Sequence, residues 1–197
     1  MNTVPINWIV LAVILVVALV AAAAVIAAHR RRESKRLRER FGPEYDRAVE
    51  QFHSPAKAEA ELKARERRVE RLNIVPLAPP EAARFAQAWN ALQVRFVDNP
   101  KGVVLQADEL VRELMAKRGY PVGDFERRAT DISVDHPAVV DNYRAAQTIA
   151  ARDLRGEAST EELRKAVVHY RTLFDELLEV RETQPEVLVS PQVPVHS

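Results

Sequence analysis

The stretch that decides the fold is WIVLAVILVVALVAAAAVIAA, residues 8–28, in which no side chain is charged or strongly polar. As an α-helix this run of 21 residues rises about 31 Å, which matches the roughly 30 Å hydrocarbon core of a bilayer. Only a helix satisfies that much backbone in lipid, because the bilayer offers no hydrogen-bond partners. The sequence therefore predicts a transmembrane anchor over residues 1–29.

The charges beside the apolar run predict its orientation. Seven Arg or Lys and two Glu lie between Arg30 and Arg40, whereas no side chain before Trp8 is charged. Basic flanks stay in the cytoplasm, so we expect a single-pass protein of the inner (plasma) membrane with its N-terminus outside and its C-terminal domain cytoplasmic. The basic side chains expected to contact lipid headgroups are Arg30, Arg31, Arg32, Lys35 and Arg36.

The alternative is a cleaved signal peptide and a secreted domain. Alanines at positions 21–24 and 27–28 resemble the small residues of a cleavage site. A signal peptide, however, has positive charge before an apolar region of about 7–15 residues. Here the N-terminal side is uncharged and the apolar run is longer, so we favour a retained anchor.

Composition limits what the rest of the chain can do. Residues 30–72 hold 14 basic and 9 acidic side chains, whereas residues 73–183 hold 15 and 18. The mildly acidic distal part argues against nucleic-acid binding. Cysteine is absent, which excludes disulfides, a thiol nucleophile and a thiolate metal site. We expect no cofactor and no bound metal.

Residues 30–72 are predicted to form a basic juxtamembrane segment and a helical stalk. The anchor helix should continue to Gly42-Pro43, where a second helix begins, and Ser54-Pro55 supplies the N-cap and first position of a third. In that third helix Glu59–Lys63 and Glu61–Arg65 have the i,i+4 spacing of helical ion pairs. Its apolar face is thin, so we expect either a solvated stalk or a partly packed helix.

The proline-rich NIVPLAPP, residues 73–80, predicts the start of a compact helical bundle over residues 73–183. The pattern predicts five helices there. The first has Phe85, Ala88, Trp89, Leu92 and Phe96 on one face, and the second runs from Asn99-Pro100 to Gly119. The third covers residues 123–132, the fourth begins near His136-Pro137, and the fifth opens with the capping box Ser159 and Glu162. Residues 184–197 are predicted to be a disordered, Pro-containing tail. The expected fold class is all-α: a transmembrane helix, a charged stalk and a small bundle.

Six phrases of this sequence are specific when taken together: FGPEYDRAVE (41–50), RERRVERLNIVPL (65–77), QVRFVDNPKGVV (93–104), MAKRGYP (115–121), ISVDHPAVV (132–140) and STEELRKAVVHYRTLFDELL (159–178). This set resembles a group of small bacterial single-span membrane proteins with a helical domain. The likeness runs from about residue 37 to 180. It implies the architecture just described, and it implies no activity and no catalytic residue.

One polar cluster stands out as a candidate site. His136 follows Asp135, and Asp131 lies about one helical turn earlier. A His–carboxylate pair can act as a general base or hold a metal, but the same residues also cap helix ends. No second His or nucleophile has a matching spacing, so we expect a capping cluster. Tyr143 and Arg144 complete the candidate wall.

These observations predict a non-enzymatic, membrane-anchored helical interaction or scaffold module that binds another protein or a second copy of itself. The alternative is a small ligand-binding protein or enzyme that uses a pocket between the helices. A cleft of a few hundred Å³ formed by Asp135, His136, Tyr143 and Arg144 would favour that alternative.

Overall fold

The computed structural model describes residues 6–178, which form eight α-helices. The all-α prediction is confirmed. The chain divides into two compact units. The first contains residues up to Arg71 together with 129–140, and the second contains residues 72–128 together with those from Asp141 onward. The predicted tail, residues 184–197, lies outside the described residues.

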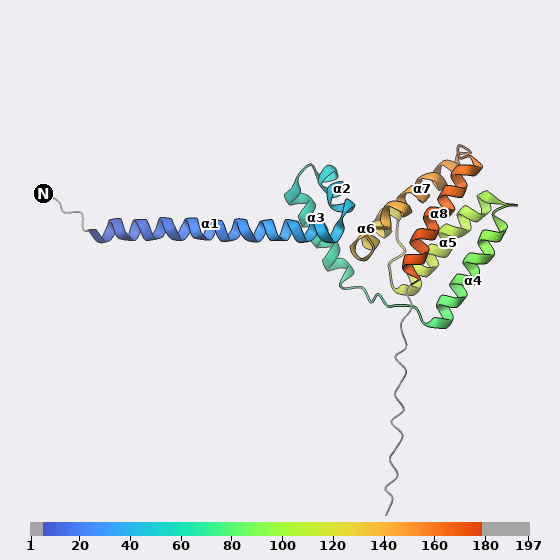
Figure 1. Cartoon of the computed structure of the whole chain (residues 1–197), viewed down its shortest axis with the longest axis horizontal. Helices are drawn as coiled ribbons and strands as arrows, with labels where there is room; N and C mark the ends of the chain where they lie inside the picture. The colour runs from blue at the N-terminus through green and yellow to red at the C-terminus, as the bar shows by residue number, and fades with distance from the viewer. Residues whose placement is uncertain (1–5, 179–197) are drawn as a thin grey trace, which may run out of the picture. The chain divides into compact units, whose positions relative to one another are not determined.

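The first helix, α1 (Ile6–Phe41), confirms the predicted continuation of the apolar run into the charged flank. Figure 1 shows it as one unbroken helix. It is the one helix of residues 6–178 that is long and apolar enough to cross a membrane, and its most apolar 18-residue window has a mean hydropathy of 3.4 and no buried residue. By length and composition, it is a candidate membrane anchor or signal sequence.

The end of α1 packs with the next two helices, α2 (Pro43–Phe52) and α3 (Pro55–Val69). Gly42 has a left-handed φ of 49° and separates α1 from α2, which begins with the predicted proline. The Ser54 hydroxyl accepts a hydrogen bond from the Lys57 N–H, as predicted. The buried apolar side chains of these three helices are Leu37, Phe41, Tyr45, Ala48, Ala58, Leu62 and Val69. Of the two expectations for α3, the structure therefore shows the packed one.

In the second unit, α5 (Pro100–Arg118) packs against both α4 (Pro79–Arg95) and α8 (Thr160–Leu177). The apolar stripes of the three helices meet in a core that includes Phe85, Trp89, Val111, Leu114, Tyr170 and Phe174. The Trp89 ring stacks on that of Phe174 with centroids 4.6 Å apart. Phe96 was expected on the inner face, but it follows the last residue of α4 and is only half-buried.

The helix ends of this unit follow the predicted signals. Asn99 accepts a hydrogen bond from the Gly102 N–H at 3.0 Å. Gly119 has a φ of 97°, and a Cβ there would lie 2.4 Å from the carbonyl oxygen of Asn73. Ser159 and Glu162 form both hydrogen bonds of a capping box. Local sequence signals therefore fix where α5 and α8 begin and where α5 ends.

The region around His136 differs from the prediction. The third bundle helix, α6 (Phe125–Asp135), begins and ends later than the expected residues 123–132, and α7 (Val140–Leu154) begins at Val140 rather than near Pro137. The His136 N–H still donates to Ile132 O at 2.8 Å. Pro137 has no N–H with which to continue α6, so a turn follows it. Residues 129–140 also group with the first unit, which the predicted division at residue 73 does not include.

Candidate functional sites

Ion pairs join α1 to α3 in the first unit. Arg36 donates two hydrogen bonds to the carboxylate of Glu66, at 3.0 and 2.9 Å, and Arg40 lies 3.3 Å from the same carboxylate. Lys63 forms an ion pair with Glu33 at 2.8 Å. Two residues three apart on α1, Glu33 and Arg36, thus meet two residues three apart on α3 in the same order. These ion pairs hold α3 against α1 where the two helices cross (Figure 1).

A second polar contact involves Glu59 of α3. Its Oε1 accepts hydrogen bonds from the Ser34 hydroxyl at 2.6 Å and from the Tyr45 hydroxyl at 2.9 Å. Burial and this hydrogen bond to a carboxylate raise the pKa of Tyr45. The Tyr45 hydroxyl therefore stays protonated at neutral pH and acts as a donor. The arrangement connects α1, α2 and α3 through one carboxylate.

The residues predicted to contact lipid headgroups divide into two groups. Arg36 is engaged with Glu66 and Glu33, and Lys35 lies 3.6 Å from Glu39. In the described part of the chain, no ion pair involves the remaining three, which are exposed: Arg30, Arg31 and Arg32. These three guanidinium groups are the ones whose charge is uncompensated by a neighbouring carboxylate.

The predicted polar cluster includes three residues of the first unit. Asp131 is fully buried and accepts a hydrogen bond from Arg68 Nε at 2.7 Å. His136 is half-buried and Asp135 is exposed. Arg68 was not a predicted member, because it lies 63 positions from Asp131 in the sequence. This contact ties Asp131 to α3, whereas its buried Oδ2 accepts no hydrogen bond within the described residues. The capping interpretation of the cluster stays a prediction.

The other two predicted residues belong to the second unit. The Tyr143 hydroxyl is buried and accepts a hydrogen bond from Arg128 Nε at 2.8 Å. Arg144 lies 3.9 Å from Asp141 on the same helix. Burial raises the pKa of the Tyr143 hydroxyl, although the bond from Arg128 opposes that shift. A neutral phenol held by a guanidinium is a core contact and a poor general base.

A pocket of about 340 Å³ lies between α5 and α7 in the second unit. Two exposed leucines line this pocket, one from each helix: Leu105 is 56% exposed and Leu154 is 84% exposed. The lining is mostly aliphatic with a few polar groups, and consists of Lys101, Gly102, Val104, Leu105, Asp108, Gln147, Ala150, Ala151, Asp153 and Leu154. It includes none of the five residues of the predicted cluster.

Asp108 is the polar centre of this pocket. Its Oδ1 accepts hydrogen bonds from Gln147 Nε2 at 2.5 Å and from the Tyr170 hydroxyl at 3.1 Å, and Arg112 pairs with its Oδ2 at 3.0 Å. Burial, and secondarily the charge of Asp108, raise the pKa of Tyr170. The phenol is therefore a fixed neutral donor to the carboxylate. Sequence reasoning missed Asp108 because its partners lie up to 62 positions away.

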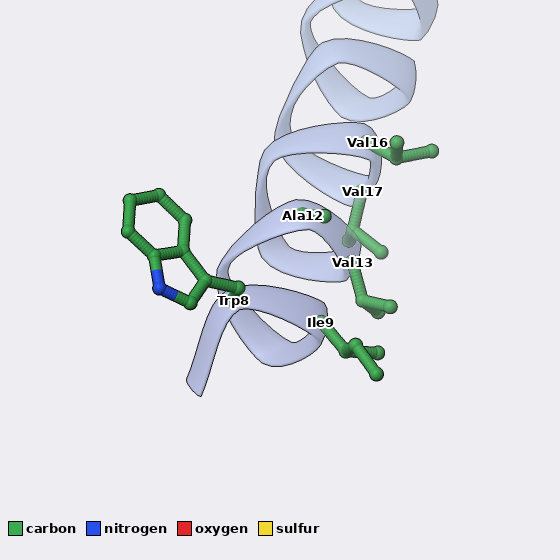
Figure 2. Close-up of a pocket in the computed structure, with 6 residues that line it drawn as sticks. All are labelled: Trp8, Ile9, Ala12, Val13, Val16 and Val17. Carbon is green, nitrogen blue, oxygen red and sulfur yellow. The ribbon is translucent and has the colours of Figure 1, made fainter. Parts of the chain in front are cut away.

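No group of three or more His, Cys, Asp or Glu side chains suited to a metal ion occurs among the residues that the structure describes. His169 Nδ1 lies 2.8 Å from the side-chain oxygen of Asn142. Figure 2 shows an apolar hollow on the first turns of α1, where Trp8 points to the opposite side from Ile9 and Val13. It contains no charged side chain and is part of the exposed surface of the apolar helix.

Comparison of the chain with models of protein families, with characterised proteins and with solved structures finds no match. The resemblance to small bacterial single-span proteins therefore stays a prediction from the sequence.

Proposed function

We propose that the protein is a non-enzymatic, single-pass membrane protein whose cytoplasmic helical domain is an interaction module held at the inner membrane. The observation that carries this proposal is the continuity of α1. The helix runs without a break from the apolar run into the first unit, where Leu37 and Phe41 are fully buried. The anchor and the first unit share one structural element, so no flexible linker separates these two.

The uncompensated arginines support the proposed direction. Arg30, Arg31 and Arg32 follow directly after the apolar run, and no carboxylate within residues 6–178 pairs with them. Moving such a charge through hydrocarbon costs about 2.5–3.5 kcal/mol per residue on insertion scales. Three adjacent guanidinium groups favour an orientation that leaves them, and the domain beyond them, on the cytoplasmic side.

The surface that best supports binding of a protein is the pocket between α5 and α7. Exposed aliphatic side chains are common singly, but two leucines beside one apolar hollow form a contact surface. A partner side chain inserted between Leu105 and Leu154 would cover both. We therefore assign the interaction with another protein, or with a second copy, to this face of the second unit.

The test begins with membranes from cells that express the full chain. Alkaline carbonate should leave the protein in the membrane pellet, and cross-linking in intact cells should give a discrete adduct. The double variant Leu105→Ser/Leu154→Ser should lose the adduct. Val168→Ser should keep it, because Val168 is exposed on α8 and does not line the pocket. Extraction of the protein by carbonate, or an adduct unchanged in the double variant, would contradict the proposal.

A second candidate function is binding of a small molecule in the same pocket. The observation that favours it is the polar floor, in which Asp108 is fixed by Gln147 and Tyr170. A ligand with a positive group would share that carboxylate with Arg112, so Asp108→Asn would weaken its binding. A protein partner would depend mainly on the two leucines. The two sets of variants therefore separate the candidates.

A further inference from the structure

A pocket of about 270 Å³ lies where the end of the apolar run meets α3 in the first unit. Residues 26, 29, 30 and 33 of α1 are spaced three, four and seven apart, so they share one face of that helix. Residues 59 and 63 of α3, one turn apart, form the opposite wall. The pocket is lined by Ile26, His29, Arg30, Glu33, Glu59 and Lys63.

The depth of this pocket follows from the helix rise. The apolar run ends at Ala28, and Arg30 and Glu33 follow about 3 and 7.5 Å farther along the axis. The headgroup layer on each side of a bilayer is roughly 5–8 Å thick. If α1 is a retained span, as the proposed function holds, the pocket opens at the level of the headgroups. Ile26 then lies at the edge of the hydrocarbon.

The charges within the pocket are only partly matched. Glu33 and Lys63 neutralise each other at 2.8 Å. Within residues 6–178, Glu59 accepts hydrogen bonds from two hydroxyl groups and makes no ion pair, which leaves its negative charge uncompensated. Arg30 makes no ion pair within the described residues. The pocket thus presents one uncompensated carboxylate from α3 and one uncompensated guanidinium from α1.

We propose that this pocket binds the headgroup of a zwitterionic aminophospholipid, with the phosphate on Arg30 and the primary ammonium on Glu59. A guanidinium suits phosphate because its N–H groups form a fork. A primary ammonium has three N–H donors for the free oxygen of Glu59, whereas a quaternary ammonium has none. The volume is slightly below the roughly 300–1,000 Å³ of pockets for drug-sized ligands, which suits a headgroup of few atoms.

The experiment uses the full chain purified in detergent and native mass spectrometry with lipids of identical acyl chains. Phosphatidylethanolamine and phosphatidylcholine compete for the protein, and phosphatidylglycerol is tested in the same way. We expect phosphatidylethanolamine to be retained about tenfold over phosphatidylcholine, the effect of one charge-assisted hydrogen bond. Glu59→Gln should remove that preference, and Arg30→Ala should lower retention of both lipids.

Arg31→Ala is the matched control, because Arg31 is also exposed and without an ion pair but does not line the pocket. It should keep the preference. Equal retention of the two zwitterionic lipids by the wild-type chain would overturn the proposal, and this comparison needs no variant to fold. Stronger retention of phosphatidylglycerol, unchanged in Glu59→Gln, would also overturn it and assign lipid binding to the basic flank alone.

Failure of this proposal is distinguishable from failure of the proposed function. A chain that stays in the membrane but shows no headgroup preference contradicts only the lipid site. A shortened chain that begins near His29 and is recovered from the medium contradicts both.

Discussion

The carboxylate of Glu66 offers the sharpest test of how the anchor is joined to the first unit. Its side chain is only 8% exposed, and it pairs with Arg36 and Arg40, which are 47% and 41% exposed. Removing one partner of a fully buried pair costs about 3–5 kcal/mol, whereas an exposed pair contributes about 0–1 kcal/mol. Because the two arginines can turn toward water, Glu66→Gln should destabilise the packing of α3 by about 2 kcal/mol.

Hydrogen exchange of the full chain in detergent measures this locally. A loss of about 2 kcal/mol in the opening free energy makes exchange of the α3 amides about 30-fold faster. Peptides from α5, in the second unit, serve as the internal reference. Glu70→Gln removes the same charge from the exposed residue that follows α3. It should change the opening free energy of the α3 amides by less than about 0.5 kcal/mol. Equal exchange of α3 in both variants would refute the role assigned to Glu66.

Three further predictions concern the second unit. Gly119→Ala should lower the free energy of unfolding by more than about 2 kcal/mol in urea titrations, because the added Cβ would lie 2.4 Å from the carbonyl oxygen of Asn73. Gly156 also has a positive φ, of 74°, but an added Cβ there would meet no atom within 4 Å, so Gly156→Ala should cost only about 1 kcal/mol. Hydrogen bonds from the backbone N–H and the hydroxyl of Ser159 lower the pKa of the Glu162 carboxyl to about 2. The stabilisation that this carboxylate contributes is therefore complete above about pH 4.5 and is lost as the pH falls toward 2. The difference in urea midpoint between wild type and Glu162→Gln should therefore vanish over that range, and a difference that persists at pH 2 would contradict this. Tyr143→Phe leaves the Nε of buried Arg128 without its acceptor, although an Nη of the same guanidinium still donates to the Gly123 carbonyl, and should cost about 1–3 kcal/mol by the same titration. An unchanged midpoint would show that Arg128 does not need that hydroxyl.

The helices were predictable from short-range signals. The proline after Gly42, the cap at Ser54 and the left-handed Gly119 all act within a few residues, so the sequence carries them directly. Where two local signals conflict, the prediction is wrong. Pro137 suits the first turn of a helix, but it also ends α6, and α7 begins three residues beyond it.

Contacts between side chains far apart in the sequence were not predictable in the same way. The i,i+4 rule identifies Glu61–Arg65 correctly at 3.2 Å. The same rule pairs Glu59 with Lys63, yet the structure gives Lys63 to Glu33 and gives Glu59 to two hydroxyl groups. Tertiary packing decides between such partners because an exposed helical ion pair contributes only about 0.3–0.5 kcal/mol. The two pockets likewise depend on helix pairs that no local pattern specifies.

The proposed topology, with α1 retained as a span and the helical domain on the cytoplasmic side, can be tested by cysteine labelling. The chain contains no cysteine, so single cysteines introduced at Thr3 and at Val97 report on the two sides without background. Val97 is 86% exposed, and a maleimide that cannot cross the membrane reaches it only from the side on which the domain lies. In intact cells we expect labelling of Thr3→Cys and protection of Val97→Cys until the membrane is permeabilised. Labelling of Val97→Cys in intact cells would contradict it.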